Sequence, residues 1–144
     1  MKFSDFSNNQ IIEAGPYVVT ETEVLEFANR YDPQWFHADS QAAKHGRWNG
    51  LIASGWHTSA IAMRLACDAF LSDTASWGSP GLDYVKWLSP VRPGDSLTLQ
   101  ATIIEARPST SKSGVGIVKW RWQLFNQGKI EVFDTVVHSF FDAA

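Results

Sequence analysis

A long apolar segment at residues 55–71 constrains the fold more than any other feature of this chain. Apolar side chains occupy nearly every side of the helix that this segment predicts, so we expect a helix surrounded by other structure. Its polar members His57, Arg64 and Asp68 fall on one narrow stripe, at spacings of seven and four residues. Arg64 and Asp68 can pair there, and we interpret the stripe as structural.

Segments with a hydrophobic period of two follow this helix, and they are rich in Val, Ile, Thr, Phe and Trp. The predicted strands are 11–19, 82–87, 96–105, 116–125 and 130–141. One strand, a helical section and four antiparallel strands give an α+β fold in which the sheet curls around the central helix. A chain of 144 residues has room for one such core, so we expect a single domain over residues 1–144.

A second helix is predicted ahead of the buried one. Thr20 and Glu23 have the spacing of a capping box, in which each side chain accepts the amide of the other residue. The helix should cover residues 21–31, and Pro33 should end it, because proline disfavours helical geometry at the residue before it. The chain then enters an irregular segment, in which Asp39 is placed to cap a short helical turn.

The composition excludes several classes of function. A formal net charge of −3 gives no broad electropositive surface, so we expect no nucleic-acid partner. The only cysteine cannot pair within the chain, no secretion leader opens the sequence, and the longest apolar stretch is too short to span a bilayer. We therefore expect a soluble cytoplasmic protein with no membrane partner.

Asp32 and His37 are the main candidates for chemistry. They lie five positions apart on predicted irregular backbone, among several aromatic residues. Aromatic surroundings raise the pKa of a carboxyl group and a nearby imidazolium lowers it, and such opposed shifts separate an acid from a base at neutral pH. The residues alone leave an alternative open, in which Asp32 is a helix N-cap and His37 is a loop histidine bonded to a carbonyl.

The entry to the buried helix is the second candidate. Residues 50–55 read Gly-Leu-Ile-Ala-Ser-Gly, and unpaired amides at the helix start, at Ser54 and Gly55, can hold a carbonyl oxygen as negative charge gathers on it. The alternative is that Ser54 simply caps the helix and Gly55 permits tight packing. Neither a metal nor a nucleotide cofactor is predicted, because the spacings of the histidines and glycines match no metal site or phosphate-binding loop.

Several short motifs follow one another at fixed spacings. They are Phe27-Ala28, Asp32, His37, Asp39, Ala42-Ala43, the glycine-bounded segment 50–55, and the later stretches 78–81 and 90–95. In this order they resemble the MaoC-like dehydratases, which include the (R)-specific enoyl-CoA hydratases. That family has the hot-dog fold, an antiparallel β-sheet wrapped around a long central α-helix, and the resemblance covers nearly the whole chain.

The resemblance implies an acyl-CoA hydratase or dehydratase, which adds water reversibly to a trans-2-enoyl-CoA to give a 3-hydroxyacyl-CoA, a reaction of fatty acid metabolism. Asp32 and His37 would position and deprotonate the water, and the amide of Gly55, next to Ser54, would hold the thioester oxygen. The CoA thioester is then the substrate, with no further cofactor. The resemblance also implies a homodimer or a higher homo-oligomer, and exposed sheet edges favour such association independently.

Two departures from the family pattern leave alternatives open. Many (R)-specific hydratases read Asp-x-Asn-Pro-x-His, whereas residues 33–36 here are Pro-Gln-Trp-Phe, and Met63 stands where some hydratases have a serine near the substrate. The alternatives are a hot-dog acyl-CoA thioesterase and a non-catalytic acyl-CoA-binding or lipid-binding module. Candidates for contacts with the CoA phosphates are Arg92, Arg107 and Lys112, each with an equal claim as a surface charge.

Overall fold

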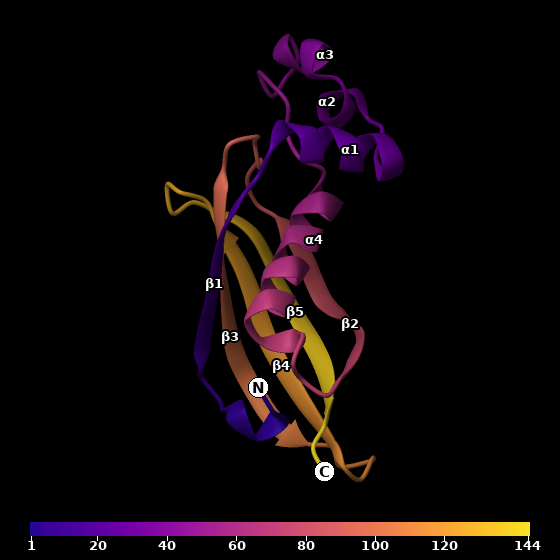
Figure 1. The fold of residues 1–144 in the computed structure, drawn as a ribbon, viewed down its shortest axis with the longest axis vertical. Coiled ribbons are helices and arrows are strands. Elements are labelled where there is room, and N and C mark those ends of the chain that lie inside the picture. The colour runs from indigo at the N-terminus through magenta and orange to yellow at the C-terminus, as the bar shows by residue number, and fades with distance from the viewer.

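Five antiparallel strands wrap around one long helix in the computed structural model, which describes residues 1–144 (Figure 1). The strands are β1 (Ile11–Val18), β2 (Ser76–Trp87), β3 (Ser96–Pro108), β4 (Val115–Phe125) and β5 (Glu131–Asp142). The helices are α1 (Glu21–Tyr31), α2 (Trp35–Ala38), α3 (Ser40–Lys44) and α4 (Gly55–Ala66), with a 3-10 turn at Phe3–Asp5 and a π-helical turn at Cys67–Leu71. α1, α2 and α3 gather at one end of the sheet, and both chain termini lie at the other (Figure 1).

α1 begins and ends where the sequence predicts. Thr20 Oγ1 accepts the amide of Glu23 at 3.2 Å, and Glu23 Oε2 accepts the amide of Thr20 at 3.2 Å, which closes the capping box. Asp32 is the C-cap residue, as expected from Pro33. The following segment is less irregular than predicted, because it forms α2 before Asp39 caps α3 by accepting two backbone amides.

α4 is the buried centre of the fold, and it lies against one face of the sheet (Figure 1). Its inward side chains are Ile61, Ala62, Leu65 and Ala66. The predicted helix is confirmed, although its last turn is π-helical. Arg64 and Asp68 pair at 3.1 Å as expected, whereas His57 leaves that stripe and pairs with Glu23 of α1. None of the helices combines the length and the apolar character that a bilayer span requires.

The sheet has the strand order β1-β3-β4-β5-β2, and every neighbouring pair is antiparallel. Side chains alternate between the two faces of the sheet. Among the strands, β1, β3 and β4 contact α4 most closely. Trp120 of β4 is fully buried and packs against Phe6, Phe70 and Trp122. This arrangement confirms the α+β hot-dog fold.

β2 departs from the prediction, because it begins at Ser76 rather than near residue 82. Gly78 and Gly81 have φ values of 89° and 158°, and the pairing of β2 with β5 shifts register at these points. An edge strand tolerates such bulges and the proline between them, since one side of its backbone has no partner strand. β2 is therefore a long edge strand, and it carries exposed apolar side chains that include Trp77, Leu82 and Trp87.

Candidate active site

The chain between α1 and α4 places Asp32 and His37 beside each other. Asp32 ends α1, and the turn at Pro33 leads into α2, which carries His37. The His37 amide donates to the carbonyl of Gln34 at 2.9 Å, which holds this turn. His37 Nε2 and Asp32 Oδ2 are 3.5 Å apart. The two residues that the sequence singles out thus form one pair.

A carbonyl group fixes both the orientation and the proton of His37. The residue is 6% exposed, and its Nδ1 lies 2.7 Å from the carbonyl oxygen of Ile52. Because a carbonyl only accepts, Nδ1 carries the proton of the neutral ring, and Nε2 presents a lone pair. Nε2 and the carboxylate of Asp32 are then two acceptors side by side, so a group that donates two hydrogens, such as water, can bind to both.

Asp32 is held in its ionised form. Burial raises the pKa of this carboxyl group, but hydrogen bonds from Gln34 and Ser54 and the adjacent His37 outweigh burial and keep the pKa below its ordinary value of 3.8. Gln34 Nε2 donates to Oδ1 at 2.7 Å, and Ser54 Oγ donates to Oδ2 at 2.7 Å. At neutral pH a carboxylate therefore faces the imidazole.

Ser54 and Gly55 form the start of α4. Ser54 is the N-cap, and its Oγ accepts the amide of Trp56 at 3.3 Å while it donates to Asp32. Gly55 is the first helical residue, so its amide has no acceptor within the helix. The helix dipole favours negative charge at this end. The amide of Gly55 can therefore bind an oxygen that becomes negative.

A cavity of about 290 Å³ adjoins both His37 and Gly55. Its walls are largely apolar and include Trp48, Ile52, Ala53, Trp87, Leu88, Pro90, Val91 and Val132. Asp32 is not among the lining residues, and its carboxylate lies 3.5 Å from Nε2 of His37, which does line the cavity. An apolar space with an imidazole and a free helix amide in its wall suits a ligand with a polar head and an apolar tail.

Comparisons with known proteins agree with this architecture. Residues 6–120 match the MaoC like domain family, which is more than half of the chain. This protein belongs to the MaoC-like domain family. The match supports the hydratase and dehydratase class of function, and it agrees with the family that the sequence motifs resemble.

Three relatives show how far the likeness extends. The uncharacterized protein YdeM of Bacillus subtilis strain 168 is 30% identical over 135 residues, which cover 93% of this chain and 94% of YdeM. The crystal structure of a MaoC-like dehydratase from Rhodospirillum rubrum has a TM-score of 0.87 and 33% identity, over 96% of this chain and 94% of that one. The R-hydratase PhaJ1 from Pseudomonas aeruginosa shares the fold, with a TM-score of 0.81, 20% identity, and coverage of 99% and 86%.

The structure of this MaoC-like protein decides between the alternatives for single residues. Asp32 is not an N-cap, because α2 begins at Trp35 with Gln34 as its N-cap. His37 does bind a carbonyl, but that bond leaves Nε2 directed at Asp32. Ser54 does cap α4, and it also donates to Asp32. Ser54 therefore both caps the helix and contacts a candidate site residue.

Sequence reasoning missed two partners of the MaoC-like site. Gln34 lies two positions beyond Asp32, and its side-chain amide donates to that carboxylate. Its spacing from Asp32 is the signal that could have identified it, since a side chain two residues beyond a helix C-cap can fold back onto it. Trp87 lines the cavity from the end of β2, and no local motif marks it.

The three basic residues considered for CoA phosphates lie at opposite ends of the MaoC-like fold. Arg92 lies near the cavity, and its guanidinium donates to the carbonyl of Trp48, a lining residue. Arg107 is the penultimate residue of β3, and Lys112 follows in the loop to β4, where the carbonyl of Gly114 accepts the amide of Ala143 near the C-terminus. Only Arg92 is near the candidate site.

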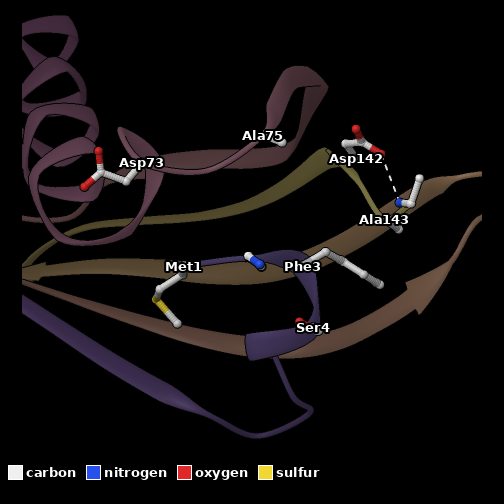
Figure 2. Close-up of a pocket in the computed structure, with 9 residues that line it drawn as sticks. Met1, Phe3, Ser4, Asp73, Ala75, Asp142 and Ala143 are labelled. Carbon is white, nitrogen blue, oxygen red and sulfur yellow. Dashed lines mark hydrogen bonds between the residues drawn. The ribbon is translucent and has the colours of Figure 1, made fainter.

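Another cavity, of about 370 Å³, lies where the two ends of the chain meet (Figure 2). Figure 2 shows the carboxylates of Asp73 and Asp142 among its lining residues, with Met1 and Phe3 on the opposite wall. No histidine lines this cavity, so no imidazole faces either carboxylate there. The chemistry of a MaoC-like dehydratase is better matched by the smaller cavity beside His37.

Proposed function

We propose that this protein is an acyl-CoA hydratase or dehydratase, which adds water reversibly to a trans-2-enoyl-CoA and forms a 3-hydroxyacyl-CoA. The observation that carries the proposal is the pair of acceptors, His37 Nε2 and Asp32 Oδ2, 3.5 Å apart beside a cavity that Gly55 also lines. Membership of the MaoC-like domain family supports it. The apolar walls of the cavity suit the acyl chain.

In the forward direction, one water donates its two hydrogens to His37 Nε2 and to the carboxylate of Asp32. Its oxygen then forms a bond with the β-carbon of the enoyl thioester, and one proton passes to the pair. The electrons of the double bond move onto the thioester oxygen, where the amide of Gly55 stabilises the developing enolate. The enolate takes the proton at its α-carbon, and the pair returns to its starting state.

The reverse reaction uses the same groups. The pair removes the α-proton of a 3-hydroxyacyl-CoA, the amide of Gly55 stabilises the enolate, and the hydroxyl group leaves as water after it receives that proton. The addition of water changes the oxidation state of one carbon up and of its neighbour down, so it needs no external oxidant or reductant. The proposed reaction therefore proceeds without a redox cofactor.

A second copy of the chain is the partner that we propose for β2. One side of this strand has no partner, and the apolar side chains Trp77 and Leu82 on it are 60% and 48% exposed. Trp56 of α4 is also exposed, and its ring packs against Trp87 of β2 with centroids 5.1 Å apart. Pairing of two β2 strands would satisfy the free backbone groups and cover these side chains.

The test of the proposed reaction is hydration of crotonyl-CoA and longer trans-2-enoyl-CoAs, followed by the loss of absorbance of the conjugated thioester. Wild-type protein should turn over at least one chain length, and Asp32→Asn and His37→Gln should each lower kcat/KM by about 10²- to 10⁴-fold. The matched controls Asp39→Asn and His45→Gln change the same chemical groups nearby, outside the pair, and should retain activity.

Other outcomes identify the rival functions. Release of a free thiol from acyl-CoA, with no hydration, would show a thioesterase on the same fold. Tight acyl-CoA binding with neither reaction would show a binding module. Turnover that both Asp32→Asn and His37→Gln leave intact would contradict the proposed roles of the pair.

A further inference from the structure

Trp87 fills the space that a side chain at position 55 would need. It is the last residue of β2 and pairs with Phe133 of β5. A Cβ atom placed on Gly55 would lie 2.6 Å from Cδ2 and 2.7 Å from Cε2 of the indole ring, which is far closer than van der Waals contact. Gly55 is therefore required by the indole of Trp87, which packs directly against the start of α4.

Two hydrogen bonds and a second ring hold this indole in place. Its Nε1 donates to Ser59 Oγ at 3.2 Å, and Ser59 Oγ donates to the carbonyl of Gly55 at 3.0 Å. Trp56 packs edge-on against Trp87, with ring centroids 5.1 Å apart. The ring is thus held by the first two turns of α4, although it is 44% exposed.

The indole also forms part of the cavity wall beside the candidate site. Trp87 lines the same cavity as His37 and Gly55, and the chain that follows it continues the wall through Leu88 and Val91. Because the ring is held on the helix, it cannot easily move aside for a bulkier ligand. The space left within these walls is about 290 Å³.

We infer that Trp87 determines the acyl-chain specificity of this protein, and that its indole limits the cavity to short, unbranched acyl groups. The inference rests on the proposed function, since it takes an acyl thioester as the ligand. A fixed apolar wall discriminates between chains that differ by methylene groups, and one methylene changes selectivity by about tenfold or more. Removal of the indole opens the space over Gly55 and Ser59 to additional carbons.

The test compares the affinities of butyryl-CoA and octanoyl-CoA, two saturated thioesters that cannot be hydrated, by isothermal titration calorimetry. Wild-type protein should bind butyryl-CoA more tightly. Trp87→Ala should raise the ratio of octanoyl-CoA to butyryl-CoA affinity by about tenfold or more. Trp87→Leu, which keeps apolar packing in a smaller volume, should shift the ratio in the same direction by less and provides a second, more conservative variant.

Two further variants test whether the effect of Trp87→Ala comes from the missing indole or from a general loss of structure. Trp77→Ala removes an exposed tryptophan from the same strand and should leave the ratio unchanged. Ser59→Ala removes the acceptor of the indole hydrogen bond and should give a smaller shift than Trp87→Ala. Unfolded protein in a preparation affects the binding of octanoyl-CoA and butyryl-CoA equally. A general loss of structure therefore does not change the ratio of the two affinities.

A ratio for Trp87→Ala within about twofold of wild type, or a wild-type preference for octanoyl-CoA, overturns the inference. The hydration assay on the same proteins keeps the two claims apart. Selective binding without turnover by wild type contradicts the proposed reaction and leaves the role of Trp87 standing. Turnover by wild type with an unchanged ratio in Trp87→Ala supports the proposed reaction and overturns the role of Trp87. Absence of binding to either thioester overturns both claims.

Discussion

Two carboxylate and imidazole pairs lie on either side of the start of α4, and they differ in one respect that matters. His37 and His57 are both 6% exposed, and each lies beside an acid, Asp32 or Glu23. His37 Nδ1 binds a carbonyl, so its Nε2 faces Asp32 across 3.5 Å at the edge of a cavity. His57 Nε2 bonds directly to Glu23 Oε1 at 3.1 Å, and its Nδ1 has no partner.

The Glu23 pair has no room for a ligand. Glu23 Oε1 also accepts the hydroxyl of Tyr17 at 2.9 Å, and Glu23 Oε2 belongs to the capping box of α1. Phe27 stacks on the His57 ring, with centroids 4.9 Å apart and planes 12° from parallel. Burial lowers the pKa of His57 and outweighs the raising effect of Glu23, so the ring is neutral at pH 7.

An acidic residue beside a histidine is therefore not sufficient to form a catalytic site. What distinguishes Asp32 and His37 is that Nδ1 of His37 is already bonded to a carbonyl, which leaves Nε2 and the Asp32 carboxylate as two neighbouring acceptors, with His37 in the wall of a cavity. In the other pair the hydrogen bond is made within the protein, and it joins two helices. The first pair is therefore the one that we propose for catalysis.

The largest expected effect is a contrast between substitutions of the two histidines, since one should lower activity and the other should lower stability. His37→Gln should lower kcat/KM for enoyl-CoA hydration by about 10²- to 10⁴-fold. His57→Gln should leave kcat/KM within a few-fold but lower the free energy of unfolding by about 1–3 kcal/mol, because the partly buried carboxylate of Glu23 loses a donor. Urea unfolding and steady-state kinetics on both variants measure this contrast, and an equal loss of activity in both would remove it.

A second prediction concerns Gly55, which shares the first turn of α4 with His57. Gly55→Ala forces a Cβ against the indole of Trp87 and should cost about 1–2 kcal/mol of stability, net of the gain in helix propensity. In a Trp87→Ala background the same change should instead stabilise by up to about 1 kcal/mol. A double-mutant cycle by urea unfolding measures the sign change, and equal costs in both backgrounds would disprove the contact.

Ser54→Ala should affect the first pair without abolishing it. Loss of the helix cap should cost about 1 kcal/mol. Loss of the hydrogen bond to Asp32 should raise the pKa of that carboxyl group, so the acid limb of the kcat/KM profile should move to higher pH. Ser54→Thr keeps the hydroxyl group and should restore the wild-type profile. An acid limb that does not move in Ser54→Ala would show that this bond does not tune Asp32.

The smallest effect is the pH dependence of stability that His57 contributes. Its pKa is lowered in the folded protein from an ordinary value of 6.5, so below that pH the unfolded chain binds more protons. The free energy of unfolding should therefore fall as the pH decreases below about 6.5, by at most about 1.4 kcal/mol per pH unit. Unfolding in urea between about pH 5 and 7.5 tests this. His57→Gln should reduce the slope, and His45→Gln should keep it.

Features encoded over a few residues were predictable. The capping box of α1, its end before Pro33 and the alternation of the strands all depend on neighbours in the sequence, and each is present. The start of β2 was not predictable, because glycines and a proline usually mark turns, and only pairing with β5 reveals an edge strand with bulges.

Contacts within the site between residues far apart in the sequence could be identified only from the structure. Spacing along α4 placed His57 with Arg64 and Asp68, whereas its partner is Glu23, on a helix that packs across α4. The bond from Ser54 to Asp32 likewise joins residues 22 positions apart. No local spacing encodes the angle at which α1 meets α4, so motifs could name Asp32, His37 and Ser54 but not the bond that joins Ser54 to Asp32.

α1 is joined to the first turn of α4 at both of its ends. Near its start, Glu23 bonds to His57, and at its finish Asp32 bonds to Ser54. Asp32 thus lies beside the residue that precedes Gly55, and the junction of the two helices holds the carboxylate close to the amide. An insertion or deletion within α1 would shift Glu23 relative to Asp32 by about 1.5 Å and about 100° per residue. The two bonds to α4 could then no longer form together, even though none of the four residues had changed.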